Sequence, residues 1–203
     1  MTSRLLRSLV LAVPFIAACG VIPDVRLGAE SGIPEISGST TIAIPQGYKC
    51  GDPVTDPKGQ YQVTSSGTVD KCVFVFNQKV TALKSSDYDT NPQLQGARAV
   101  NAIDLEVSKF ALTDPSTGKE PKGLLSLDGK AFGETILTEK DLQVSPPFTK
   151  TLDGEAVDAL KDQVVNKKDI VIPVDVNVAV SLADPPAEIS LDFTAQPVLA
   201  IGF

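Results

Sequence analysis

The chain has 203 residues, 42% of them hydrophobic, which suffices for one domain with a sizeable core and argues against global disorder. Its formal net charge is −7 and it has no basic stripe with interleaved aromatic residues, so nucleic acid is not an expected partner. It contains no histidine, which excludes Ser-His-Asp and Cys-His catalysis and any His-ligated metal or haem site. We therefore expect no cofactor, no metal site and no enzymatic activity.

The first eighteen residues are arranged like a secretory signal. Arg4 and Arg7 precede an uncharged, mostly apolar run from Leu9 to Ala18. This run is about half as long as a membrane-spanning helix, and Pro14 interrupts it. It therefore predicts export of the chain without a transmembrane span.

The residues Ile16-Ala17-Ala18-Cys19 end this segment and resemble the lipobox of bacterial lipoproteins processed by signal peptidase II. The resemblance implies cleavage before Cys19, a diacylglyceryl thioether on its sulfur and usually a third acyl chain on its new amino group. Two or three acyl chains hold a protein firmly at a membrane that it does not span. Because Gly20 follows instead of aspartate, the resemblance implies the outer membrane, with the protein periplasmic or surface-exposed. A plain secretory signal with an incidental cysteine is the alternative.

Beyond the signal, residues 19–37 are expected to be the lipidated N-terminus and a Gly/Pro/Ser-containing tether, and residues 38–203 the folded domain. Within 100–113 the apolar face slips after Val107 to Phe110 and Leu112, which indicates a β-bulge. Strands are expected at residues 39–44, 60–64, 69–77, 100–113, 124–127 and 131–137.

One amphipathic helix is predicted over residues 153–166. Asp153 can cap it, and Val157, Leu160 and Val164 form one apolar stripe.

The clearest periodicity follows the predicted helix. Every even position from Ile170 to Leu182 is Ile, Val or Leu. Residues 184–186 (Asp-Pro-Pro) break this alternation and a second one continues to Phe203, so we expect two long strands joined as a hairpin. The predicted fold is mainly β: an antiparallel β-sandwich, immunoglobulin-like or similar, of roughly eight strands with the one helix.

Cys50 and Cys72 are the two other cysteines. An even pair in an exported protein predicts a disulfide. The closed loop would contribute roughly 3 kcal/mol of stability in the chain-entropy model. A redox-active pair is disfavoured because the two lack C-x-x-C spacing.

Two short motifs resemble functional sites only in part. Asp87-x-Asp89-x-Asn91 opens like a calcium loop, but proline stands at the glycine position and arginine at the bidentate glutamate position. Ser116-x-x-Lys119 matches a penicillin-binding motif but lies in a Pro/Gly turn and lacks the companion motifs. We interpret both as solvated turns.

These observations predict a non-enzymatic binding or structural module at the outer membrane. Its expected partners are the membrane, through the N-terminal lipid anchor, and other envelope proteins. A carrier or sensor of an apolar ligand such as a lipid, held in a β-sandwich pocket, is the alternative. A glycan hydrolase using carboxylates alone is disfavoured because the chain has no tryptophan.

Overall fold

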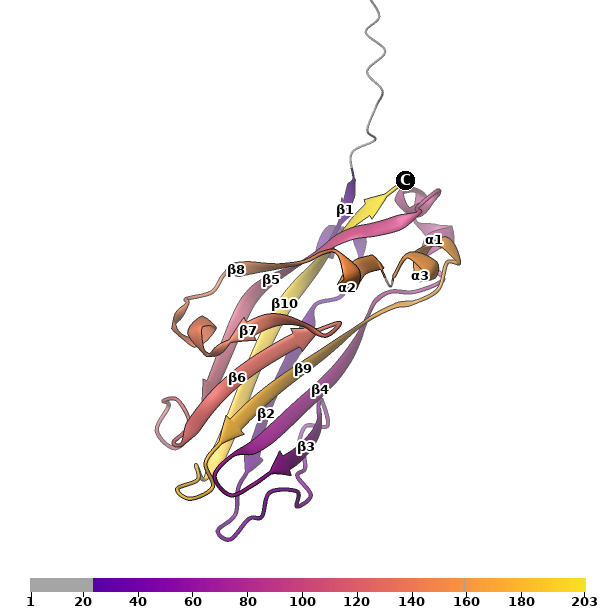
Figure 1. Ribbon diagram of the computed structural model, residues 1–203. Coiled ribbons are helices and arrows are strands. Elements are labelled where there is room, and N and C mark those ends of the chain that lie inside the picture. Colours follow the sequence, from indigo (N-terminus) through magenta and orange to yellow (C-terminus); the bar gives the residue numbers. More distant parts are fainter. Residues whose placement is uncertain (1–23, 159) are drawn as a thin grey trace, which may run out of the picture.

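The computed structural model describes residues 24–158 and 160–203, which form two five-stranded antiparallel sheets packed face to face (Figure 1). This confirms the predicted mainly β sandwich. Cys19 and the expected signal lie outside the described residues. The first sheet comprises β1 (Val25–Leu27), β2 (Ile36–Ala43), β5 (Ala99–Thr113), β8 (Phe148–Leu152) and β10 (Glu188–Gly202). The second comprises β3 (Gln62–Gly67), β4 (Cys72–Leu83), β6 (Leu124–Ala131), β7 (Glu134–Thr138) and β9 (Ile170–Val180).

The chain crosses repeatedly between the two sheets, after one or two strands in each. In the first sheet β1 and β2 both pair with β10, which is followed by β5 and then β8. In the second sheet the order is β3-β4-β9-β6-β7. The β2 edge of one sheet therefore lies on the same side of the sandwich as the β3 edge of the other.

The predicted hairpin of the last two strands is wrong, although their alternation is correct. In β9 the even positions are buried and in β10 the odd positions before Gln196 are buried. The two strands nevertheless belong to different sheets, and residues 181–187 cross between them. Alternation shows that one face of each strand is buried, but it does not show whether the two strands pair in one sheet or face each other from two sheets.

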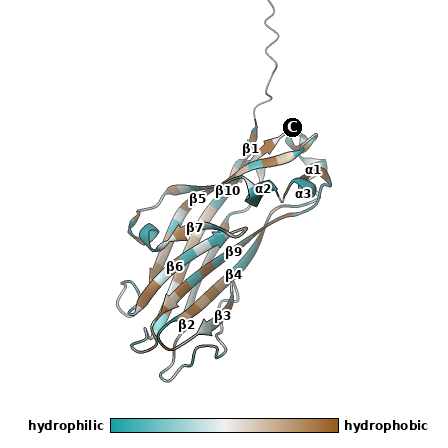
Figure 2. Cartoon of the chain, viewed as in Figure 1, coloured by the Kyte–Doolittle hydropathy of each residue, from teal (hydrophilic) through white to brown (hydrophobic). Residues whose placement is uncertain are grey.

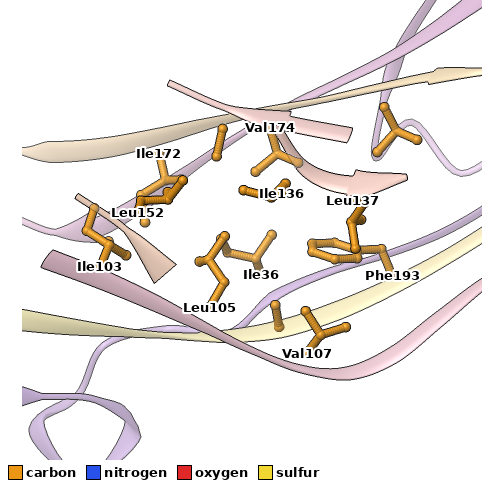
Figure 3. Close-up of a cluster of buried hydrophobic side chains, with 14 of the residues drawn as sticks. Ile36, Ile103, Leu105, Val107, Ile136, Leu137, Leu152, Ile172, Val174 and Phe193 are labelled. Carbon is orange, nitrogen blue, oxygen red and sulfur yellow. The ribbon is translucent and has the colours of Figure 1, made fainter. Parts of the chain in front are cut away.

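Side chains from both sheets fill the space between them. Ile103 and Leu105 of β5 and Phe193 of β10 face Ile172 and Val174 of β9 (Figure 3). All five are at most 1% exposed. Hydrophobic and more hydrophilic residues alternate along the strands in Figure 2, as expected when one face of each sheet meets the core and the other meets water.

The bulge predicted within residues 100–113 is present in β5. Val107 pairs with Ala195 and Lys109 pairs with Thr194, so Ser108 is the extra residue. The extra residue explains the slip of the apolar pattern, because side chains on the two sides of a bulge change face relative to strict alternation.

The single predicted helix over 153–166 is also wrong. Its span contains two short helices, α2 (Glu155–Asp158) and α3 (Lys161–Val165). The apolar stripe is nevertheless buried, with Val157, Leu160 and Val164 at most 3% exposed. Segments this short are marginal as isolated helices, so packing of the stripe decides their geometry and no continuous helix is needed.

The remaining helical segments are single turns. They are η1 (Ala29–Ser31), α1 (Asp87–Thr90), η2 (Pro92–Leu94) and η3 (Glu139–Gln143). None of the helices in the described part of the chain has the length and apolar character that crossing a bilayer requires.

The folded domain begins earlier than the expected boundary at residue 38. β1 pairs with the end of β10, and Leu27, Ile33 and Ile36 are buried. Arg26 of β1 also forms an ion pair with Asp104 of β5, across β10. Gly28 and Gly32, which the sequence placed in a tether, instead flank the turn η1 between packed residues, so any tether from Cys19 would end before Val25.

The β2 and β3 sides of the two sheets meet at Gly38 and Tyr61. A Cβ atom at position 38 would lie 2.2 Å from the Tyr61 hydroxyl oxygen and 2.5 Å from its ring. Tyr61 is only 6% exposed and packs edge-on against Phe76, so its ring has little room to withdraw. Glycine at position 38 therefore permits the two sheets to approach here.

We expect Gly38→Ala to lower the free energy of unfolding by about 1–3 kcal/mol, the usual cost of overpacking a core. In a Tyr61→Ala background the same substitution should cost much less, because the clashing ring is gone. Denaturant unfolding of the four proteins of this double-mutant cycle measures the coupling. Equal costs in both backgrounds would show that the ring does not set the requirement for glycine.

Candidate binding notch beside the disulfide loop

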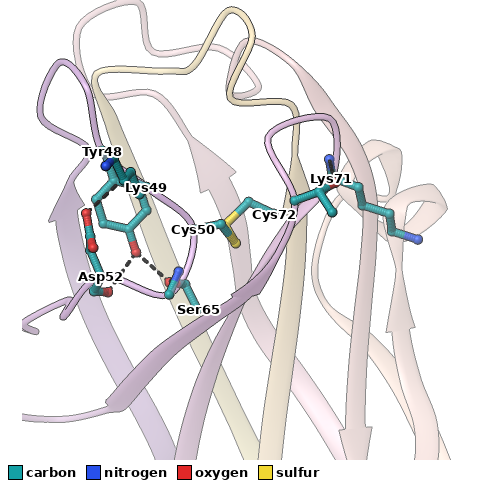
Figure 4. Close-up of a disulfide and its surroundings, with 9 residues drawn as sticks. Tyr48, Lys49, Cys50, Asp52, Ser65, Lys71 and Cys72 are labelled. Carbon is teal, nitrogen blue, oxygen red and sulfur yellow. Dashed lines mark hydrogen bonds between the residues drawn. A yellow bond between two sulfur atoms is a disulfide. The ribbon is translucent and has the colours of Figure 1, made fainter.

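The predicted Cys50–Cys72 disulfide is present and fastens a long loop to the second sheet. Cys72 begins β4 and is fully buried, whereas Cys50 lies in the loop between β2 and β3 (Figure 4). In the same loop the Tyr48 ring stacks on Phe74 at a centroid distance of 5.7 Å, and its hydroxyl donates to the Asp52 carbonyl at 3.0 Å. The loop is therefore a fixed part of the structure.

Asp56 organises the second half of this loop. Its carboxylate accepts hydrogen bonds from the Thr40 hydroxyl at 2.5 Å and from the backbone N–H groups of Lys58, Gln60 and Tyr61 at 2.9, 2.6 and 2.8 Å. Burial alone would raise the pKa of Asp56, but these four hydrogen bonds together hold it below the ordinary value of 3.8. One buried carboxylate thus joins β2 to the turn that leads into β3.

Two glutamine side chains, one from the loop before β3 and one from β4, reach across to the backbone of β2. The Ser39 N–H donates to Gln60 Oε1 at 2.8 Å, and Gln78 Nε2 donates to the Ser37 carbonyl at 3.0 Å. The opposite side of the sandwich is closed differently, by a 2.7 Å ion pair between Lys150 of β8 and Asp141 of η3. The β2 side is therefore bridged by hydrogen bonds of amides, of the Asp56 carboxylate and of Lys58, whereas the β8 side is closed by an ion pair.

An open notch of about 300 Å³ lies on the β2 side, where β3 begins beside β4. It is lined by residues 59–62 and by Asn77, Gln78 and Lys79, and its only charged lining residue is Lys79. Two buried atoms of lining residues, Tyr61 Oη and Gln78 Oε1, have no hydrogen-bond partner. Unpaired buried polar atoms are costly in a folded protein, so their presence here marks the notch as a candidate binding site.

The environment of Tyr61 keeps its hydroxyl protonated. Burial raises the pKa of Tyr61 to about 12, and the Asp56 and Asp192 carboxylates add to this effect. The hydroxyl therefore remains able to donate a hydrogen bond throughout the physiological pH range.

The two partial motifs form ordinary turns. Asp87 accepts a hydrogen bond from the Lys84 N–H at 2.8 Å, and Asp89 forms an exposed ion pair with Lys167. The Ser116 hydroxyl donates to Asp114 at 2.6 Å inside the β5–β6 turn. Within residues 24–158 and 160–203, no group of three Asp, Glu, Cys or His side chains is suited to hold a metal ion.

Sequence reasoning missed the notch entirely. Its amides come from the end of a loop and from the middle of β4, and no motif or spacing connects them. Only the pairing of β3 with β4 and the facing position of β2 bring them together.

Comparison with known proteins identifies no relative of the chain. No protein-family model matches the chain, no curated protein is significantly similar to it, and no solved structure matches it. The function must therefore be argued from the chain itself.

We expect Asp56→Ala to lower the free energy of unfolding by about 2–4 kcal/mol, because a buried hydroxyl and three backbone donors lose their acceptor. Asp52→Ala is the matched control, since that exposed carboxylate accepts only the Lys49 N–H and should cost about 1 kcal/mol or less. Because folding lowers the Asp56 pKa, its stabilisation is present well above pH 4 and is lost as the pH falls below it. Denaturant unfolding at pH 7 and pH 3 should show a smaller Asp56→Ala effect in acid, and a pH-independent effect would contradict this assignment.

Replacing both disulfide partners, as Cys50→Ala/Cys72→Ala, should destabilise the fold by about 3 kcal/mol from lost loop closure, with a further cost for the cavity at buried Cys72. Reduction of the wild-type protein is the control that leaves Cys72 in place. Thermal unfolding of the variant, and of the wild-type protein with and without reductant, measures the two effects. An unchanged midpoint on complete reduction would show that the disulfide contributes no net stability.

Proposed function

We propose that the protein is a bacterial envelope lipoprotein, anchored at the outer membrane through acyl chains on Cys19, that acts as a non-enzymatic binding module. The observation that carries this proposal is the segment Ile16-Ala17-Ala18-Cys19 at the end of a signal-like N-terminus. The cell location and the absence of catalysis both belong to the proposal.

The arrangement of the chain supports an anchored module. β1 begins at Val25, so the chain between Cys19 and the sandwich reaches at most about 20 Å. β1 pairs with the end of β10, so the first described strand and the C-terminus lie at one end of the sandwich (Figure 1). An anchor at Cys19 would hold that end near the membrane and leave the sides of the sandwich accessible.

The core favours a binding module over a carrier of an acyl chain. The inner faces of both sheets pack directly against each other, as the cluster around Leu105 and Val174 shows (Figure 3). The open notch of about 300 Å³ is lined mainly by amides and one lysine. Sites for apolar ligands are enclosed and mostly apolar, so the notch suits a polar partner.

The anchor is tested by expressing the full chain in a double-membraned bacterium with a clickable fatty acid. Wild type should carry the acyl label and fractionate with the outer membrane, whereas Cys19→Ser should lose the label and accumulate as uncleaved precursor. The Cys50→Ala/Cys72→Ala variant is the matched control, because it retains only Cys19 and should keep the label. Retention of label and membrane attachment by Cys19→Ser would refute the anchor.

A further inference from the structure

β4 is longer than the strand that borders it. β3 pairs only with Cys72–Asn77, whereas β9 pairs with β4 as far as Leu83. Along residues 78–83, which we call the free β4 edge, no strand in the described chain pairs with β4 on the β3 side. Ala82 and Leu83 are buried, so the accessible part of this edge is residues 78–81. Because alternate residues of antiparallel strands direct their N–H and C=O groups to opposite sides, this part presents unpaired backbone groups over roughly 13 Å.

Two hollows border this edge, one at each end. The notch includes Gln78 and Lys79, and a second hollow of about 190 Å³ includes Thr81, Ala82 and Lys84. The second hollow is completed by Gly32 and Pro34 of the segment before β2, together with Asp87. The edge and its two hollows thus form a continuous candidate surface along the side of the sandwich.

The unpaired groups at this surface include both donors and acceptors, because the strand edge offers backbone N–H and C=O groups. Beneath the notch, the buried Tyr61 hydroxyl can donate and the buried Gln78 Oε1 can only accept. A polyhydroxylated sugar would suit the notch alone. An extended polypeptide has alternating N–H and C=O groups along its whole length, so it suits the notch and the edge together.

The charges at the edge indicate what kind of polypeptide fits. Lys79 is exposed, and neither it nor Lys84 forms an ion pair among the described residues. The free β4 edge carries no acidic residue. Pairing with the same edge of a second copy would therefore place lysines near lysines, which disfavours self-association.

We propose that the free β4 edge binds an extended segment of another envelope protein as an added strand, with an acidic residue of that segment opposite Lys79. This inference deepens the proposed binding function and rests on it for the identity of the partner as an envelope protein. The added strand would continue the second sheet beyond the start of β3, and its backbone would supply the main affinity.

The test uses the full-length protein in detergent and a capped peptide of about ten residues, with alternating Val and Thr and a Glu near each end. Hydrogen exchange should show protection of residues 78–83 on saturation with peptide at up to about 1 mM. The same peptide N-methylated at alternate positions cannot complete a strand ladder and should not protect them. Equal binding of the two peptides would overturn the proposal. Protection of β5 residues 109–113 instead, which pair with β10 but have no partner strand on the β8 side, would also overturn it.

Charge variants supply the second measurement. Lys79→Glu should weaken binding of the acidic peptide about fivefold, and a peptide with Lys in place of Glu should bind this variant better than wild type. Lys71→Glu is the matched control: it makes the same charge change at an exposed residue just before the other end of β4, and should change affinity less than about twofold. An equal effect of both variants would show general charge repulsion and not a site at the edge.

The outcomes also separate this inference from the anchor. Peptide binding by detergent-solubilised protein does not depend on acylation, so Cys19→Ser should bind the peptide as wild type does. If Cys19 proves not to be acylated but the peptide still binds, the edge remains a binding site and only the identity of its partner as an envelope protein is refuted. An acylated protein that binds an oligosaccharide at the notch but not the peptide would refute the edge proposal alone.

Discussion

Burial of strand faces across the gap between two sheets is the constraint on which the rest of this structure depends. β9 and β10 each carry one continuous apolar face, and neither face can be covered by a neighbour within its own sheet. Placing the two strands in opposite sheets lets Phe193 and Val174 line the same core (Figure 3). Because β9 and β10 are central strands, this arrangement also determines which strands lie at the edges.

Different interactions join the two sheets at the two sides of the sandwich. On the β8 side the carboxylate of Asp141 forms an ion pair with the Lys150 ammonium. It also accepts a hydrogen bond from the Thr138 N–H and so caps η3. On the β2 side the sheets approach closely at Gly38, and neutral side chains bridge them at Gln60 and Gln78. Paired charges leave few unsatisfied groups, whereas an amide has separate donor and acceptor atoms that must each find a partner. The unpaired Gln78 Oε1 follows from this difference.

Local patterns in the sequence predicted where the strands lie better than which strands pair with each other. Alternation in residues 170–182 identified β9, and the slip after Val107 identified the β5 bulge, because both signals arise from side-chain direction along one strand. The hairpin was wrong because strand pairing depends on distant segments: β9 pairs with β4 and β6, and β10 with β1, β2 and β5. The disulfide was predictable from the two cysteines that remain once Cys19 is assigned to the expected lipid anchor. The notch depends on relative strand lengths that no local pattern encodes.

The stability of the disulfide loop and the openness of the β4 edge have a common origin. Asp56 accepts the backbone N–H groups of Gln60 and Tyr61, so these residues are held in a turn toward β2. β3 consequently pairs with β4 only from Gln62 onward, opposite Asn77. If residues 57–61 instead continued the strand, their backbone would cover the β4 edge beyond Asn77 and the carboxylate would lose its donors. The same hydrogen bonds that stabilise the loop thus leave the edge unpaired, and the candidate binding surface lies next to a turn that four hydrogen bonds to Asp56 hold in place.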